Sequence, residues 1–265
     1  MRQTVEHEIK ANNGGAKFSF RDCKETLHGS QTKLVIETNE ATAGLLIELN
    51  GKPLTPQQQQ DEEHRLMWLA NNPDELQRKQ KAEREDAYRT TRIMRAIPDA
   101  FIYEADGTEP GQQGLGKPGI ELLRFKFRPN PSFVPPSRVE QVLTGMQGYV
   151  LIDQSAHRIA KIDGTLIKDV NFGWGILGHL SKGGHFLVQQ AEVGNNEWEV
   201  TRMDLAFTGK ELLFRNINIK STEVFTDFRP APAHLSFAQA VEFLKKQSAE
   251  LAANHAAANG DPPRQ

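Results

Sequence analysis

The sequence lacks the cysteines of a disulfide-bonded fold and the long apolar run of a membrane-spanning helix. It has one cysteine, Cys23, in 265 residues, so no intrachain disulfide can form and a disulfide-stapled secreted fold is excluded. No apolar run approaches the roughly 18 residues that a membrane-spanning helix needs, so we expect no transmembrane segment. Residues 1–8 contain no apolar segment of the kind found in a signal peptide, and we expect none in this sequence. The sequence leaves two interpretations open: a cytoplasmic protein, or a mature form whose signal peptide has been removed.

The sequence also lacks an excess of charge of either sign. Its 32 basic and 34 acidic residues give a formal net charge of −2. A basic field strong enough to hold nucleic acid or an anionic membrane is therefore absent from the chain as a whole. We expect no nucleic-acid partner.

Metal-ligand spacing is missing as well. His179 and His185 are six residues apart, which fits neither adjacent turns of a helix nor alternate residues of one strand. No cysteine pair and no His-Glu-x-x-His motif accompanies them. We interpret these histidines as loop or surface residues, and we predict neither a metal site nor a cofactor.

The remaining motifs that could carry catalysis are incomplete. The glycine-rich stretch 111–119 resembles a phosphate-binding loop, but Lys117 is followed by proline instead of serine or threonine. Asp153 and Asp163 lie at predicted strand ends, where aspartate is favoured for local hydrogen bonds. No nucleophile elbow is present. The sequence therefore predicts no catalytic residues and no enzyme.

What the sequence does contain is a regular succession of strand-like runs. Turn signals such as Asn50-Gly51 separate them, and over residues 120–228 these signals recur about every 8–12 residues. No alternation of strands with helices is visible there, so a parallel sheet is not expected. We predict consecutive antiparallel strands over 120–228.

Helix-start signals interrupt and follow these strands. Thr55 and Gln58 form a capping box around a helix-starting proline, which predicts a helix over 56–70. A similar signal predicts a second helix over 73–97, and apolar spacing predicts a C-terminal helix over 236–253. The predicted fold class is α+β, with a curved antiparallel sheet, an incomplete barrel, covered by a helical insertion.

These elements predict a simple domain organisation. Residues 1–15 are polar and glycine-terminated, so we expect a flexible N-terminus. Residues 16–254 form a single domain with the helical insertion at 55–97, and 255–265 form a disordered tail.

The stretch from Val170 to Leu180 combines aromatic and aliphatic side chains with three glycines. One interpretation is an apolar segment that lines or gates a pocket. The other is a bent strand whose glycines mark bulges in a tightly curved sheet. The sequence leaves both open.

Several short segments together resemble a known family of bacterial envelope proteins. They are 148–153 with 162–164, 182–184, 198–200, 209–214 and 50–54. In these segments the chain is similar to the outer-membrane lipoprotein-sorting proteins and periplasmic lipoprotein carriers (LolA/LolB-like). The resemblance covers most of residues 17–228.

The resemblance implies a half-barrel whose concave apolar face holds acyl chains without chemistry, in the periplasm. The expected partner is a lipid, an acyl chain or another apolar small molecule, with a second envelope protein as a further possibility. The expected pocket residues are Phe172, Trp174, Ile176, Leu177, Leu180, Leu66, Leu69, Ile93 and Ile97. The alternative is a structural or protein-interaction module of the envelope without a ligand, and the third is an enzyme with a dispersed site.

Overall fold

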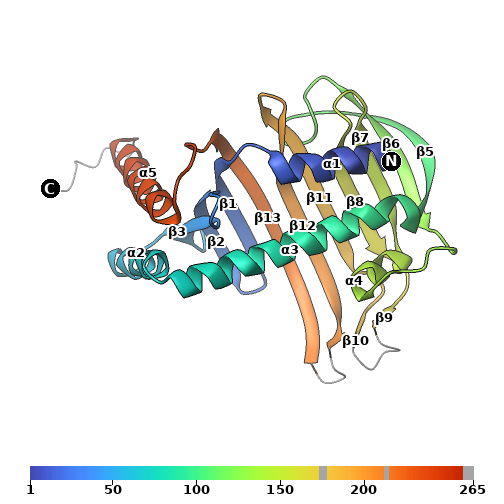
Figure 1. The fold of residues 1–265 in the computed structure, drawn as a ribbon, viewed down its shortest axis with the longest axis horizontal. Coiled ribbons are helices and arrows are strands. Elements are labelled where there is room, and N and C mark those ends of the chain that lie inside the picture. Colours follow the sequence, from blue (N-terminus) through green and yellow to red (C-terminus); the bar gives the residue numbers. More distant parts are fainter. Residues whose placement is uncertain (173–177, 212–214, 259–265) are drawn as a thin grey trace. The chain divides into compact units, whose positions relative to one another are not determined.

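The computed structural model describes residues 1–172, 178–211 and 215–258 (Figure 1). The chain divides into two compact units. Unit 1 consists of Met1–Gly15, Glu25–Leu27 and Asp86–Val224, and unit 2 consists of Ala16–Lys24, His28–Glu85 and Phe225–Gln265. The sequence predicts one domain over 16–254 instead. Because the segments of the two units are interleaved along the chain, no shift in composition marks a boundary.

The fold is α+β, as predicted, with an open antiparallel sheet. The described strands are β1 (Phe18–Thr26), β2 (Gly29–Ile36), β3 (Ala43–Leu49), β4 (Lys52–Pro53), β5 (Phe101–Pro110), β6 (Glu121–Pro129), β7 (Met146–Asp153), β8 (Arg158–Leu166), β9 (Val170–Phe172), β10 (Gly178–Leu180), β11 (His185–Gly194), β12 (Glu197–Glu211) and β13 (Arg215–Pro230). Their order is β4-β3-β2-β1-β13-β12-β11-β8-β7-β6-β5, with β10 pairing with β12 and β9. This path ends at β4 and β5, so the described strands do not close into a barrel.

The predicted antiparallel strands over 120–228 are confirmed. In unit 1, β6 pairs with β7, β7 with β8, β8 with β11, β11 with β12, and β12 with β13, each antiparallel. A short helix α4 (Arg138–Gln141) and a 3-10 turn η1 (Val142–Gly145) precede β7. Asn195 and Asn196, with φ of 53° and 60°, close the β11–β12 hairpin. Asparagine tolerates this left-handed conformation, which matches the twist of the strands.

The two helices of the insertion also form where predicted. Helix α2 (Pro56–Ala70) begins with the Thr55 capping box, in which Gln58 N–H donates to Thr55 Oγ1 at 3.3 Å and Thr55 N–H donates to Gln58 Oε1 at 2.9 Å. Helix α3 (Pro73–Ala100) runs three residues beyond the predicted end at 97. Pro98 lies in its last turn, where a missing N–H removes one backbone hydrogen bond without ending the helix.

The N-terminus is helical, whereas the sequence predicts a flexible segment over 1–15. Helix α1 (Arg2–Gly14) buries Val5 against the core of unit 1. It also buries Glu8, whose carboxylate accepts hydrogen bonds from Arg158 Nε at 2.9 Å and Nη2 at 3.0 Å. The backbone N–H of Ile159 donates to the same carboxylate at 2.6 Å. The polar composition hid this helix because its partner lies 150 residues away.

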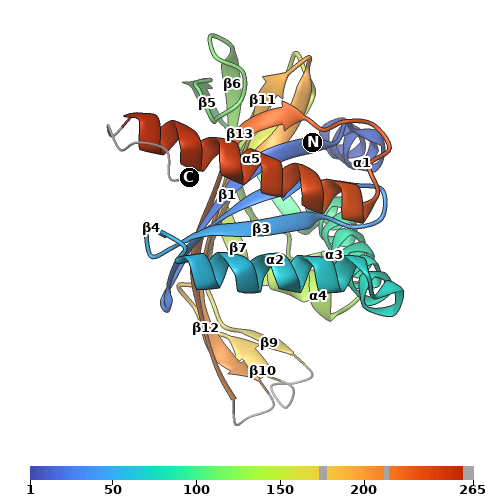
Figure 2. The same ribbon diagram turned by 90° about the vertical axis from the view of Figure 1, so that its left-hand side faces the viewer.

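At the other end of the chain, helix α5 (Phe237–Ala258) continues past the predicted end at 253. The predicted tail 255–265 therefore begins as helix, and residues 259–265 lie outside the described residues. Figure 2 shows α2 and α5 beside β3 in unit 2. None of the described helices is long and apolar enough to cross a membrane.

Each unit has its own apolar core. In unit 1, side chains of α1 and α3 pack with those of the sheet, including Val5, Ile97, Phe127 and Val150. In unit 2, α2 and α5 pack on β2 and β3. The buried residues of that core are Leu34, Ile36, Ala41, Ala43, Leu45, Leu66, Phe237, Ala240, Val241 and Leu244.

Candidate functional site

The predicted pocket residues divide between the two cores. Leu66 is 1% exposed in the core of unit 2, and Leu69 packs against it half-buried. Ile97 belongs to the core of unit 1, and the half-buried residues that pack against that core include Ile93, Phe172 and Leu180. Trp174, Ile176 and Leu177 lie outside the described residues.

Two of these predicted residues, Leu66 and Leu69, line a cavity of about 350 Å³ within unit 2. Its walls come from β1, β2, β3, the end of β13 and the helices α2, α3 and α5. The lining residues are Phe20, Asp22, Lys33, Val35, Thr42, Gly44, Arg65, Leu66, Leu69, Lys79, Glu83, Phe225 and Phe237. We call this space the unit 2 cavity.

The unit 2 cavity combines aromatic and aliphatic side chains with charged ones, namely Asp22, Lys33, Arg65, Lys79 and Glu83. The rings of Phe20 and Phe225 meet edge to face with centroids 5.9 Å apart. Val35 is 6% exposed, and Phe237 is completely buried. Aromatic and aliphatic walls of this kind favour an apolar guest over water.

Most charges around the unit 2 cavity are already paired. Lys79 Nζ lies 2.7 Å from Glu83 Oε1, and the same carboxylate accepts from Thr42 N–H at 3.1 and 3.3 Å. Arg65 donates to both oxygens of Glu62 at 2.6 and 2.8 Å, and these hydrogen bonds raise its pKa. Lys33 has no ion-pair partner among the residues that the structure describes. An acidic group on a guest would therefore find a free ammonium at Lys33.

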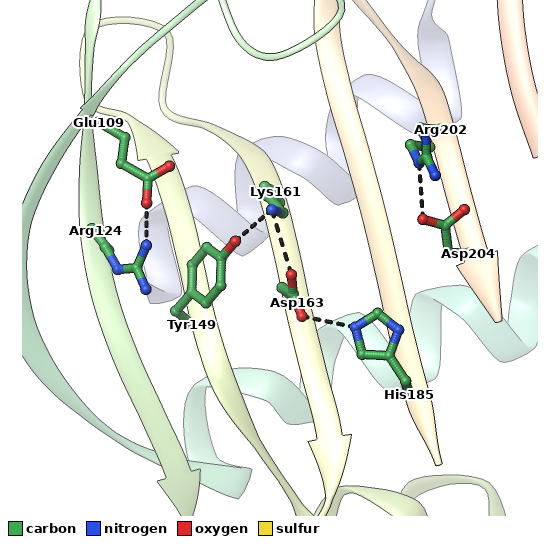
Figure 3. Close-up of polar contacts among 8 residues, drawn as sticks. All are labelled: Glu109, Arg124, Tyr149, Lys161, Asp163, His185, Arg202 and Asp204. Carbon is green, nitrogen blue, oxygen red and sulfur yellow. Dashed lines mark hydrogen bonds and ion pairs between the residues drawn. The ribbon is translucent and has the colours of Figure 1, made fainter. Parts of the chain in front are cut away.

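The sheet of unit 1 carries a second candidate site, a row of polar side chains (Figure 3). In this view the side chains stand in front of the strands and the helices lie behind them. We call these residues the polar row, and the face that carries them the open face. The polar row consists of Glu109, Arg124, Tyr149, Lys161, Asp163, His185, Arg202 and Asp204.

The centre of the polar row is a hydrogen-bonded chain across β7, β8 and β11. Lys161 donates to the Tyr149 hydroxyl and lies 3.4 Å from Asp163 Oδ2. Asp163 Oδ1 lies 3.0 Å from Nε2 of His185. The strand register brings these side chains together. Tyr149 of β7 lies directly opposite Asp163 of β8. His185 of β11 lies opposite Thr165, which is two positions from Asp163 and so on the same face of β8.

Electrostatics keep Lys161 charged. Burial is the largest single influence and lowers its pKa, but the contacts with Tyr149 and Asp163 outweigh it, so the pKa is raised above its ordinary value. A lysine that stays protonated is a poor nucleophile, since only the neutral amine attacks a carbonyl. The hydrogen bonds of Tyr149, Lys161 and Asp163 therefore hold a positive charge in place, and Lys161 is a poor nucleophile there.

Arg124 connects the polar row to the edge strand β5. Its guanidinium lies 3.8 Å from the centroid of the Tyr149 ring, donates through Nε to Asp106 at 2.8 Å, and contacts Glu109. Hydrogen bonds from Lys126 and Arg124 lower the pKa of Asp106. Beside these residues lies a cavity of about 610 Å³, the unit 1 cavity. Its lining residues are Ile102, Tyr103, Glu104, Arg124, Lys126, Phe127, Arg128, Gln147, Gly148 and Tyr149.

A third cavity, of about 600 Å³, lies beside the end of α1 in unit 1. Two of its strongest charges are already paired: Arg158 binds Glu8, and Lys117 Nζ lies 2.8 Å from Glu192 Oε2. The contact with Lys117 lowers the pKa of Glu192. Because Arg158 and Lys117 are already paired, they are less available to bind a ligand than Lys33 and Arg128, which line the other two cavities.

Sequence reasoning missed the polar row. It treated His185 together with His179, whereas the structure pairs His185 with Asp163. The detectable signal was alternation, since Lys161 and Asp163 are polar residues two positions apart on one strand. The predicted turn role of Asp153 is confirmed, because its Oδ1 accepts from Ala156 N–H at 2.9 Å and from the Ser155 hydroxyl at 2.6 Å. The described residues bring together no three His, Cys, Asp or Glu side chains that could hold a metal ion.

Comparison with known proteins adds little. No protein-family model matches the chain, and no curated protein sequence is similar to it. A solved structure that matches is the crystal structure of a DUF1329 family protein from Desulfovibrio piger ATCC 29098. It is 10% identical, with a TM-score of 0.30, over 89% of this chain and 94% of that one. This likeness is too distant to establish a shared fold or function.

Proposed function

We propose that the protein binds a small amphipathic molecule, with an apolar chain and one acidic group, in the unit 2 cavity and without chemistry. The observation that carries the proposal is a cavity of about 350 Å³ whose lining combines aromatic and aliphatic side chains with a lysine, Lys33, that has no ion-pair partner in the described part of the chain. The volume is at the lower end of the ~300–1,000 Å³ typical of small-molecule sites.

The energetics of such a site are favourable. Each methylene group that leaves water gains about 0.8 kcal/mol, so ten of them gain about 8 kcal/mol before the cost of association is subtracted. A carboxylate cannot enter an apolar cavity without a partner, because an unpaired buried charge is strongly disfavoured. Lys33 supplies that partner at the polar side of the unit 2 cavity.

The lining of the unit 2 cavity also supports binding without reaction. It contains Thr42 as a hydroxyl but neither histidine nor cysteine among its described members. A nucleophile needs an adjacent base to be activated, and Glu83, the carboxylate beside Thr42, is occupied by the Thr42 N–H and by Lys79.

The test is isothermal titration calorimetry with decanoate below its micellar concentration. The wild-type chain should bind, and Leu69→Gln should weaken binding about tenfold, because an amide then faces the apolar chain. Leu27→Gln is the matched control, since Leu27 is 52% exposed and lies in unit 1. The proposal fails if the wild-type chain does not bind decanoate, or if the two variants lose affinity equally.

The alternative function is a structural or protein-interaction module without a ligand. The packed core of unit 1 favours it, because side chains of α1 and α3 occupy one face of that sheet. Absence of decanoate binding together with a measurable protein partner would support this alternative.

A further inference from the structure

The unit 1 cavity is lined by hydrogen-bond donors on the open face of the sheet. Three basic residues, Arg124, Lys126 and Arg128, occupy alternate positions of β6, so their side chains leave the strand on the same face. Gln147 and Tyr149 of β7 add an amide and a hydroxyl. Glu104 is the acidic residue among the described lining.

Many of these donors remain unused. Arg128 is exposed and has no ion-pair partner among the described residues. Arg124 uses Nε for Asp106 and Nη1 for Glu109, which leaves the two N–H groups of Nη2 available. Lys126 lies 2.6 Å from Asp106 Oδ1 and retains further ammonium hydrogens. A ligand that only accepts hydrogen bonds would satisfy all three side chains.

The polar row sets the direction of the Tyr149 hydroxyl. Lys161 can only donate, so the Tyr149 oxygen must accept that bond, and the phenolic hydrogen is left to donate elsewhere. On its other side, Lys161 Nζ lies 3.4 Å from Asp163 Oδ2. Asp163 Oδ1 in turn lies 3.0 Å from Nε2 of His185, which fixes the position of the carboxylate. The polar row therefore leaves the phenolic hydrogen of Tyr149 available to a ligand as one more donor.

We propose that the unit 1 cavity binds a small soluble anion bearing carboxylate or phosphate groups, held by Arg124, Arg128 and Tyr149. Guanidinium groups bind both kinds of anion through paired N–H donors, so the shared chemistry is an oxygen-rich anion. This site is independent of the unit 2 cavity and of the apolar ligand proposed there.

The experiment is isothermal titration calorimetry of the full chain at low salt, with citrate and inorganic phosphate as separate probes. Arg128→Gln should weaken binding of the better probe about tenfold, because a charge-assisted donor is lost. Tyr149→Phe keeps the ring under Arg124 but removes the hydroxyl, and should weaken binding about threefold. Circular dichroism of each variant should match that of the wild-type chain.

Arg84→Gln is the matched control, since Arg84 is an exposed arginine of α3 in unit 2 and the substitution removes the same charge. Its affinity for either probe should equal that of the wild-type chain. A parallel flotation assay compares phosphatidic acid vesicles with phosphatidylcholine vesicles. Binding of citrate or phosphate that falls in Arg128→Gln and Tyr149→Phe alone supports the site. Equal losses in Arg84→Gln, no response to either probe, or binding to phosphatidic acid vesicles alone would overturn it.

Discussion

The two cavities differ in what their walls leave unsatisfied. The unit 2 cavity combines apolar side chains with charged ones, of which Lys33 has no ion-pair partner in the described residues. The unit 1 cavity instead has hydrogen-bond donors beside a row of paired charges. The comparison teaches that pairing, and not the number of charges, decides what a surface can bind. Lys161 and Asp163 are charged but hold each other, while Lys33 and Arg128 remain available to a ligand.

The same contrast extends to stability, where the largest effect is expected. Unit 1 fixes α1 through the buried pair of Glu8 and Arg158, whereas the core of unit 2 is held by apolar packing. Glu8→Ala leaves Arg158 buried without a partner and should lower the free energy of unfolding by about 3–5 kcal/mol. Urea unfolding measures this loss, with the exposed Glu6→Ala of the same helix as control. A loss under 1 kcal/mol would show that the pair does not anchor α1.

A crossed binding experiment sharpens the comparison between cavities. Leu69→Gln should weaken decanoate about tenfold and leave citrate unchanged, because a polar amide disturbs only the apolar wall. Arg128→Gln should weaken citrate about tenfold and leave decanoate unchanged, because the unit 1 cavity loses one charged donor. Calorimetry with both ligands on both variants checks this. If either variant weakens both ligands equally, the two cavities are not independent sites.

Lys33→Gln separates the acidic group of the ligand from its chain. The variant should weaken decanoate roughly fivefold, because hydrogen bonds to charged groups are stronger than those to an amide. Decanol, which has no charge, should bind the variant and the wild-type chain alike. Lys52→Gln, an exposed lysine of β4 in unit 2, serves as the control. If the variant loses affinity for decanol and decanoate equally, Lys33 does not bind the acidic group of the ligand.

The smallest effect concerns pH and the carboxyl of Glu37 in unit 2. Burial raises its pKa above the ordinary value, and the hydrogen bond from Phe18 N–H at 3.1 Å offsets this only in part. A carboxyl group whose pKa is raised by folding stabilises the folded state when it is protonated. Its contribution to the free energy of unfolding is therefore present at low pH and lost as pH rises through the raised pKa. Glu37→Gln keeps an acceptor for Phe18, so its stability relative to the wild-type chain should rise as pH increases from the ordinary carboxyl pKa to the raised one, and stay constant above it.

Urea unfolding between about pH 4 and pH 7 measures the pH dependence, across the range where carboxyl groups ionise. The exposed Glu25→Gln should show no such trend. A difference between Glu37→Gln and the wild-type chain that is the same at every pH would contradict the assignment.

Local signals in the sequence predicted much of the fold. The Thr55 capping box gave the start of α2, and the period-two strands over 120–228 gave the antiparallel pairs, because both depend on neighbouring residues. Helix α1 could not be predicted, since Glu8 is stabilised by Arg158 from a distant strand. The division into two units was hidden for the same reason.

The candidate sites were predictable only in part. Leu66 and Leu69 were predicted to line a pocket, because apolar residues on one helix face turn inward. Phe20 and Phe225 meet them from strands more than 200 residues apart, which only the pairing of strands can show. Likewise, Asp163 gains His185 across the β8–β11 register, and no spacing within either strand encodes that contact.

Methyl NMR of the full chain during a decanoate titration tests the central claim most directly. The account predicts saturable shifts of the methyl groups of Val35, Leu66 and Leu69, which line the unit 2 cavity. The methyl groups of Leu122 and Leu151, buried in unit 1, should stay in place. Shifts confined to unit 1, or no saturable shift in the three residues of unit 2, would contradict it.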